Sequence, residues 1–371
     1  MGAVAVALAS ACASAAPPTS PTGGTPAPVE SAARPESPAP SRSAAGSTVA
    51  STAESPAATG TSDFIDLNAS GALQIDAPLG SDSAVLAGGF LVTTDVGGGM
   101  EVYELSGKLL YPLSVPGGAC GVPDVGFGAI WTATCAASPG LVRVDDSSFF
   151  AAPVDIGGGV ADPRGSVAAA ESGVWLIRAG ARNELIEVDP EVQSRAVVFS
   201  EAAPTGSTAV RAGYGAVWVS SPSLNRITRV DPASGAVVAT IDVGRSPDVV
   251  AVGENAVWML DETDGSVSRI DPATNAVVAT VSLGEAVASG AITVGGGYVW
   301  VRGSTTLLFE IDPASNQIVK RYGPASGSGG VAADDSAVWI TAHDSTTIWR
   351  LDLGEANASG LGIPLEPTFR A

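Results

Sequence analysis

Six tryptophans recur along this chain at intervals of about forty residues. Each ends the same sequence motif, a small turn followed by an apolar run, as in Gly215-Ala-Val-Trp218. An apolar residue followed by Asp comes twelve to fourteen residues later, as in Val230-Asp231. A repeat of this length made of short strands is typical of a β-propeller, in which each repeat forms one blade of a ring. The tryptophans are Trp131, Trp175, Trp218, Trp258, Trp300 and Trp339.

Each repeat divides into four apolar segments separated by turn residues, most clearly at 247–253, 255–260, 267–272 and 276–283. The 45 glycines and 26 prolines suit short strands joined by tight turns. A seventh unit without the tryptophan occupies residues 84–105. We therefore predict an all-β fold, a seven-bladed β-propeller of four-stranded blades over residues 63–371, with eight blades as the main alternative.

Residues 64–76 resemble the turn and final strand of a repeat, yet they have no blade of their own. We expect the strand near 73–76 to complete the blade that contains Trp339, because pairing the two ends removes an exposed sheet edge. The Asp residues of turns such as 231–235 and 271–275 look like a row of acidic ligands. Turn formation explains them, since Asp can bond the turn backbone and Pro presets φ. Likewise, we expect the tryptophans to pack between blades rather than to form a ligand platform.

Residues 1–12 are apolar and end in Ala9-Ser10-Ala11-Cys12, which looks like a secretory signal and resembles a bacterial lipobox. Residues 13–62 are rich in Ala, Pro, Ser and Thr, so we expect a disordered linker. These features predict an extracytoplasmic protein of the cell envelope, attached to the membrane only through a lipid on Cys12. If the Cys is incidental to an ordinary cleaved signal, the protein is secreted instead.

The net charge of −20 repels phosphate backbones, which makes nucleic acid an unsuitable partner. Ligands of propellers usually sit over the central channel, where the loops from the fourth strand to the first and from the second to the third meet. Mixed charges there could bind a partner protein or a polar or anionic small molecule, because Arg binds carboxylates in bidentate fashion. The alternative is a rim of individually hydrated charges. The candidate ligand-binding residues are Arg164, Arg178, Arg245, Asp248, Asp261, Arg302 and His343.

Cys120 and Cys135 are nearly symmetric about a turn expected near Phe127, four residues before the first tryptophan. Two strands joined by that turn would bring the cysteines together, and export makes oxidation plausible. We expect a disulfide between them, with two free buried thiols as the alternative.

The phrase Val-Asp-Pro-Ala-Ser/Thr followed by Val-Val-Ala-Thr closely resembles the YVTN-type propeller repeat over residues 205–283. That group neighbours the NHL-repeat and virginiamycin B lyase-like propellers, so the resemblance implies seven blades. Its members range from surface proteins to a lyase, in which a His works near acidic residues that hold magnesium. At the corresponding acidic positions this chain has Thr341 and Asn357, and His343 is its only histidine. We therefore expect a non-catalytic binding or sensing domain with no metal or cofactor. The alternative is a metal-assisted lyase that uses magnesium.

Overall fold

The computed structural model describes residues 63–354, except 163–164, 171, 182, 194–195, 200–201 and 205. Cys12, the linker predicted at 13–62, Arg164 and Asn357 therefore lie outside the described residues. Within that part of the chain, none of the helical structure is long and apolar enough to cross a membrane.

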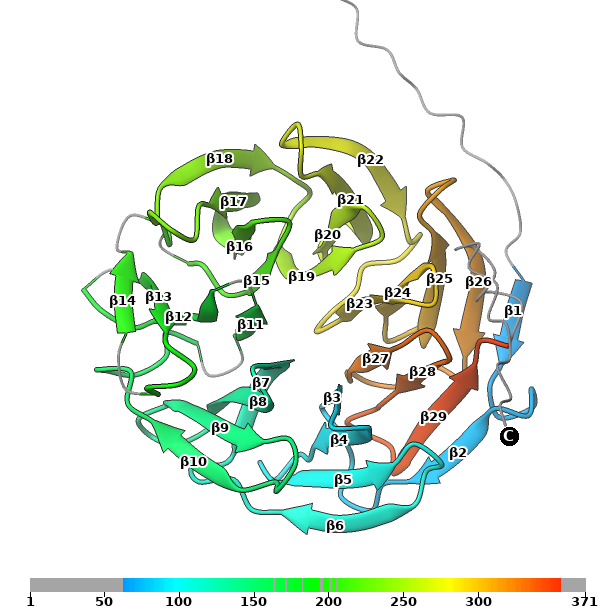
Figure 1. The fold of residues 1–371 in the computed structure, drawn as a ribbon. Coiled ribbons are helices and arrows are strands. Elements are labelled where there is room, and N and C mark those ends of the chain that lie inside the picture. The colour runs from blue at the N-terminus through cyan, green and yellow to red at the C-terminus, as the bar shows by residue number, and fades with distance from the viewer. Residues whose placement is uncertain are drawn as a thin grey trace, which may run out of the picture. The chain divides into compact units, whose positions relative to one another are not determined.

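Seven separate sheets form a ring, which confirms the predicted seven-bladed propeller (Figure 1). Blade 1 contains β3 (Ser83–Ala87), β4 (Phe90–Thr94), β5 (Met100–Glu104) and β6 (Leu109–Leu113). Blade 2 contains β7 (Ala119–Gly126), β8 (Ala129–Thr134), β9 (Leu141–Asp145) and β10 (Ala151–Val154). Blade 3 contains β11 (Ala168–Ala170), β12 (Gly173–Arg178), β13 (Glu184–Val188) and β14 (Ala196–Phe199).

The remaining blades follow the same order along the chain. Blade 4 contains β15 (Val210–Gly213), β16 (Ala216–Ser221), the short 3-10 helix η1 (Pro222–Leu224), β17 (Arg226–Val230) and β18 (Val237–Asp242). Blade 5 contains β19 (Pro247–Gly253), β20 (Ala256–Asp261), β21 (Ser266–Asp271) and β22 (Ala276–Ser282). Blade 6 contains β23 (Ala291–Gly295), β24 (Tyr298–Arg302), β25 (Leu308–Asp312) and β26 (Gln317–Gly323). Blade 7 contains β27 (Val331–Ala333), β28 (Ala337–Ile340) and β29 (Thr347–Asp352).

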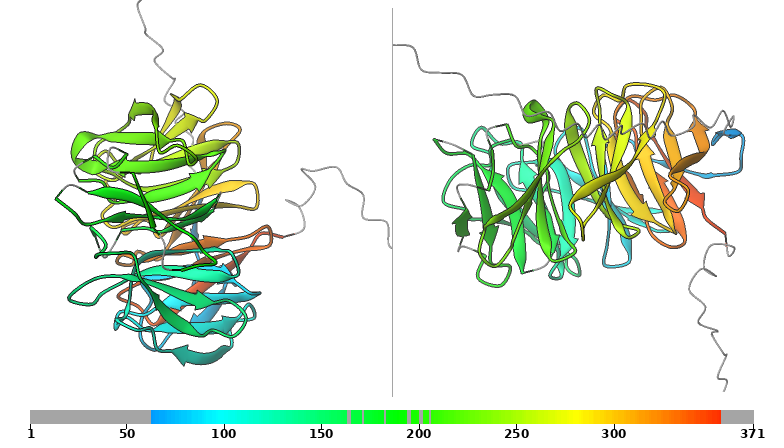
Figure 2. Two further views of the ribbon diagram at one scale, coloured as in Figure 1. Left: turned by 60° about the vertical axis from the view of Figure 1, so that its left-hand side comes forward. Right: turned by 90° about the horizontal axis from the view of Figure 1, so that it is seen from above.

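The apolar core is divided among the blade interfaces. Seven clusters of buried side chains are present among the described residues, and each joins side chains of two consecutive blades. Figure 2 shows the blades packed side by side around the ring. A sheet with two apolar faces must bury both, and here each face is covered by the neighbouring blade. The first strand of every blade, from β3 to β27, lies nearest the ring axis (Figure 1).

All six repeat tryptophans are fully buried, as blade packing requires. The indole Nε1 of Trp218 donates to the carbonyl of Gly213, the last residue of the first strand, at 3.1 Å. Trp131, Trp258 and Trp300 make the equivalent bond. In blades 2, 4, 5 and 7 an arginine on the third strand lies over the tryptophan ring, as Arg229 does 5.4 Å from the Trp218 centroid. The four tryptophans that make the Nε1 bond thus close the first hairpin of their blades while filling the interface, whereas Trp175 and Trp339 fill it without that bond.

Two of these arginines also hold the next blade. Arg229 Nη1 donates to Pro272 O at 2.6 Å and to Asn275 Oδ1 at 2.8 Å, both in the last turn of blade 5. Arg269 makes the same pair of bonds to Pro313 and Asn316 of blade 6. The turn aspartates act inside their own turns, which confirms the turn interpretation. For example, Asp231 Oδ1 accepts from Ala233 N and Ser234 N, at 2.8 and 2.9 Å.

The N-terminal segment closes the ring in two places. β2 (Leu73–Asp76) pairs antiparallel with β29 and supplies the missing outer strand of blade 7, as predicted. β1 (Asp63–Asp66) was not anticipated as a strand of its own. It adds to the outer edge of blade 6, parallel to β26, so that blade has five strands. Asp63 lies opposite Lys320 in this pairing, which places opposite charges together.

Closure through β2 can be tested with one buried and one exposed residue of the same strand. Ile75 is 3% exposed and packs at the interface of blades 7 and 1, whereas Leu73 is 39% exposed. We expect Ile75→Ala to lower the free energy of unfolding by about 2–4 kcal/mol through loss of burial and cavity formation. Leu73→Ala should change it by less than about 1 kcal/mol. Urea unfolding of both variants measures the difference, and equal effects would argue against closure by β2.

Candidate functional site

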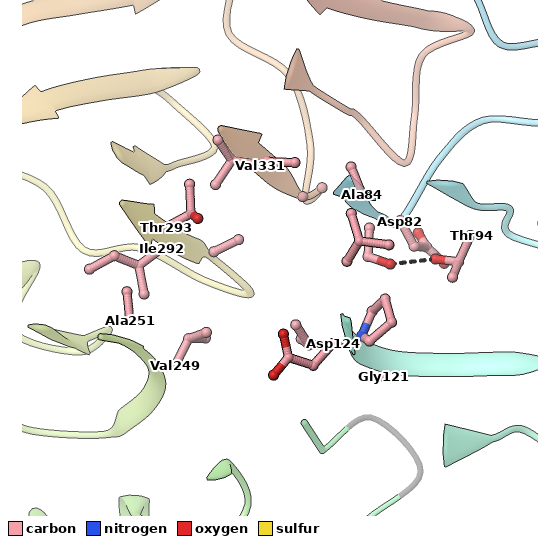
Figure 3. Close-up of a pocket in the computed structure, with 18 of the residues that line it drawn as sticks. Asp82, Ala84, Thr94, Gly121, Asp124, Val249, Ala251, Ile292, Thr293 and Val331 are labelled. Carbon is pink, nitrogen blue, oxygen red and sulfur yellow. Dashed lines mark hydrogen bonds between the residues drawn. The ribbon is translucent and has the colours of Figure 1, made fainter. Parts of the chain in front are cut away.

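A channel of about 860 Å³ runs through the ring and is lined by the first strands of all seven blades. Figure 3 shows Val249, Ala251, Ile292 and Val331 on one side of this space and Asp124 on another. The wall is mostly small and apolar, and a few polar groups converge on it. A cavity of this size and character is typical of ligand sites in proteins.

The charged groups of the channel wall are mostly acidic. Three carboxylates, one arginine and the single histidine reach it from five different blades or their connecting loops. Hydroxyl groups add neutral polar contacts. The polar lining residues are Asp82, Ser83, Thr94, Asp124, Arg211, Asp248, Ser289, Thr293, Ser328 and His343.

Asp124 and Arg211 occupy the equivalent position in blades 2 and 4, directly opposite the blade's tryptophan. Both contact the first strand of blade 3, which lies between them. Ala169 N donates to Asp124 Oδ2 at 2.9 Å, and Arg211 Nη1 donates to Val167 O at 2.8 Å. Their charges thus support the channel wall as well as facing the channel.

His343 follows the second strand of blade 7 and is 53% exposed at its side chain. Its Nδ1 forms a hydrogen bond with Asp82 Oδ1, just before β3 of blade 1. This contact links the C-terminal and N-terminal parts of the ring at the channel. It also leaves Nε2 as the ring nitrogen available to another group.

Two carboxyl groups of blade 5 lie against its neighbours, Asp248 against blade 4 and Glu262 against the loop that leads into blade 6. Burial raises the pKa of Asp248, although a hydrogen bond from Thr208 at 2.9 Å opposes that shift. Burial also raises the pKa of Glu262, and the nearby charge of Asp248 adds to the effect. Glu262 accepts from Gly290 N at 2.9 Å, and Gly290 lines the channel. These two carboxyls therefore bind protons more tightly than ordinary acids do.

Of the residues predicted from the sequence, Asp248 and His343 line the channel. The described arginines of that set are all engaged by protein groups. Arg178 pairs with Glu184 at 2.8 Å and donates to Ile156 O at 2.7 Å. Arg245 is exposed and pairs with Asp264 on the rim.

Arg302 is fully buried between blades 6 and 7. Its Nε donates to Thr341 O at 3.0 Å and its Nη2 to Gly327 O at 2.5 Å. Burial lowers its pKa to about 10, so it stays charged at neutral pH. This arginine joins the loops of two blades and does not line the channel.

Asp261 is buried at the end of β20. Ser268 Oγ donates to its Oδ2 at 2.6 Å, while Oδ1 has no hydrogen-bond partner among the described residues. Burial raises the pKa of this carboxyl to about 6. Asp261 therefore belongs to the interior of blade 5 and not to the channel lining.

In the part of the chain that the structure describes, no three His, Cys, Asp or Glu side chains are arranged to hold a metal ion. Asp82 and His343 are together at the channel, but Thr341, two residues before His343, is buried and bonded to Gly330.

Cys120 and Cys135 form a disulfide with a Cα–Cα distance of 5.2 Å, as the hairpin argument predicted. The turn lies at Phe127 and Gly128, between β7 and β8. Cys120 lines the channel, and Cys135 lies exposed in the loop that follows β8.

The raised pKa of Asp261 predicts a pH-dependent stability. Between about pH 4 and pH 6 the folded protein keeps a proton that the unfolded chain has released. The contribution of Asp261 to the unfolding free energy should therefore fall by on the order of 2–3 kcal/mol as pH rises through this window. Urea unfolding of the wild type and Asp261→Asn at pH 4 to 7 should show this fall in their difference.

Asp264→Asn provides a control of opposite sign. Hydrogen bonds from the Arg245 backbone and side chain lower the pKa of Asp264, so its contribution is lost towards acid pH. A difference curve for Asp261 that is flat, or that has the slope of the Asp264 curve, would contradict the assignment.

No family model matches this sequence, and no curated protein shows significant sequence similarity to it. A solved structure with the same fold is that of a catalytically inactive variant of virginiamycin B lyase from Staphylococcus aureus, determined with quinupristin. The TM-score is 0.62 and the identity 15%, and the match covers 76% of this chain and 99% of that one. At this identity the likeness establishes that the two proteins share a fold.

Proposed function

We propose that this protein is a non-catalytic binding or sensing propeller whose central channel holds a polar ligand. The observation that carries the proposal is the 860 Å³ channel, in which apolar walls from seven blades surround a few charged groups. Only closure of the ring brings these groups together. The ligand is a polar small molecule, or a polar segment of a partner protein inserted into the channel.

The charge of the channel favours a ligand with a positive group over the anionic ligand expected from the arginines. Three carboxylates line the channel, those of Asp82, Asp124 and Asp248, against one arginine. That arginine, Arg211, already donates a hydrogen bond from its guanidinium to a backbone carbonyl. The chain as a whole carries a charge of −20, which adds to the attraction of cations. Low-dielectric walls strengthen such an interaction relative to water.

We further propose that the propeller works outside the cell membrane, held there by a lipid on Cys12. The support is the apolar segment ending in Ala-Ser-Ala-Cys and the Ala/Pro/Ser/Thr-rich stretch that follows it. Cells fed a labelled fatty acid should incorporate it into the wild type and not into Cys12→Ser, which should leave the membrane fraction. Equal labelling of both proteins would rule out this anchor.

Binding in the channel can be tested on protein purified from its own cell envelope. The co-purifying ligand is measured by native mass spectrometry in the wild type and in Asp248→Asn. We expect about tenfold less ligand in the variant, because it loses a charge-assisted contact while keeping the shape of the side chain. Asp242→Asn is the matched control, since Asp242 lies on the outer strand β18 with an 81% exposed side chain.

Undiminished binding to Asp248→Asn would place the site elsewhere. Recovery of a chemically altered ligand would instead support catalysis if the alteration were lost in His343→Ala. The hydrogen bond between His343 and Asp82 is the contact that would orient a general base there.

A further inference from the structure

The first strand of blade 2 departs from regular pairing where it faces the channel. Cys120 pairs with Ala133 and Asp124 with Trp131, so residues 121–123 face only Thr132 across the hairpin. Such an insertion is a β-bulge, which bends its strand. Gly121 has a φ of 75°, a conformation that glycine adopts without strain. All three inserted residues line the channel, and Figure 3 shows Gly121 at its wall.

The bulge contacts the residues that lead directly into β11, the first strand of blade 3. Val122 forms an isolated parallel bridge with Ser166, and its carbonyl accepts from Val167 N at 3.2 Å. Asp124, directly after the bulge, accepts from Ala169 N at 2.9 Å. β11 pairs with its own blade through only three residues. Blade 2 therefore supplies much of the hydrogen bonding that fixes this strand beside the channel.

Further hydrogen bonds connect this segment of blade 3 to blade 4. Ser166 Oγ donates to Val210 O at 2.8 Å and accepts from Val210 N at 2.6 Å. Arg211, the next residue, donates from its Nη1 back to Val167 O at 2.8 Å. A continuous set of hydrogen bonds thus connects the first strands of blades 2, 3 and 4 along one side of the channel.

The disulfide lies at the start of this set. Cys120 is the last regularly paired residue before the bulge, and Thr132 Oγ1 donates to its carbonyl at 3.0 Å. We propose that the Cys120–Cys135 disulfide positions the channel wall of blades 2 and 3, so that reduction loosens the site. The inference rests on the proposed function in taking this channel as the ligand site.

Cys135 is exposed, which makes the bond accessible to a dithiol in solution. The dithiol supplies two electrons and two protons. The S–S bond breaks, Cys120 and Cys135 become thiols, and the reagent becomes a cyclic disulfide. Reoxidation reverses the change, so the geometry of the wall depends on the redox state.

Amide hydrogen exchange on the full chain, with and without dithiothreitol, tests the inference without a ligand. After reduction, we expect Val167 and Ala169 amides to exchange on the order of tenfold faster. Amides between β19 and β20 of blade 5 should be unchanged, and reoxidation should restore protection. Asp124→Ala with the disulfide intact is the matched control, and it should speed exchange at Ala169, which loses its acceptor, while Val167 keeps its protection.

Unchanged exchange at Val167 and Ala169 after reduction would overturn the inference. Equally faster exchange in every blade would also overturn it, because the disulfide would then stabilise the ring as a whole and position nothing. If a ligand co-purifies, its release on reduction supports the inference, and its full retention counts against it. Failure to find any ligand would count against the proposed function and leave the exchange result standing.

Discussion

Face-to-face packing of neighbouring blades is the interaction on which the rest of this structure depends. Among the residues that the structure describes, each apolar cluster is shared by two blades, so the blades do not have separate cores. β2, which completes blade 7, adds Ile75 to the cluster between blades 7 and 1. Tryptophans at equivalent places fill these interfaces, and Arg229 and Arg269 bond across two of them. The same packing forms the channel, because it fixes how closely the first strands approach the axis.

The repeat predicted this architecture well, because blade packing imposes the same demands on each unit. The tryptophan, the turn aspartates and the closing strand at 73–76 all follow from those demands. β1 was missed because Asp-Phe-Ile-Asp matches no further blade of the repeat and pairs in parallel with a strand far away in the sequence. Such an added edge strand depends on a local match of charge and shape, which the repeat does not encode.

The candidate site was only partly predictable. Assigning residues to the loops between strands predicts which of them lie on the face of the channel mouth. It does not predict which side chains point towards the axis. Arg302 turns between two blades and Arg245 pairs on the rim, whereas Asp248 and His343 reach the channel. The sequence did contain a signal for Asp124. This residue lies seven residues before its tryptophan, at a position that can be compared between repeats.

At the equivalent position the other tryptophan-bearing blades carry Ala or Thr, with one further exception, Arg211. A charge where the repeat has a small residue is informative, because packing does not require it. Here both charges serve the wall of blade 3, and both remain at the channel. Under the proposed function, these side chains support the wall and also recognise the ligand.

The pairing of β2 with β29 also delays completion of the fold during synthesis. β2 is among the first structured segments to be made, whereas its partner, residues 347–352, comes near the end of the chain. At about 5–20 residues per second, the early strand waits on the order of tens of seconds for that partner. During this time its edge and the face of blade 1 are uncovered, and such surfaces are prone to aggregation. A chain exported before it folds would avoid this exposure in the cytoplasm, because both strands would be present when folding begins.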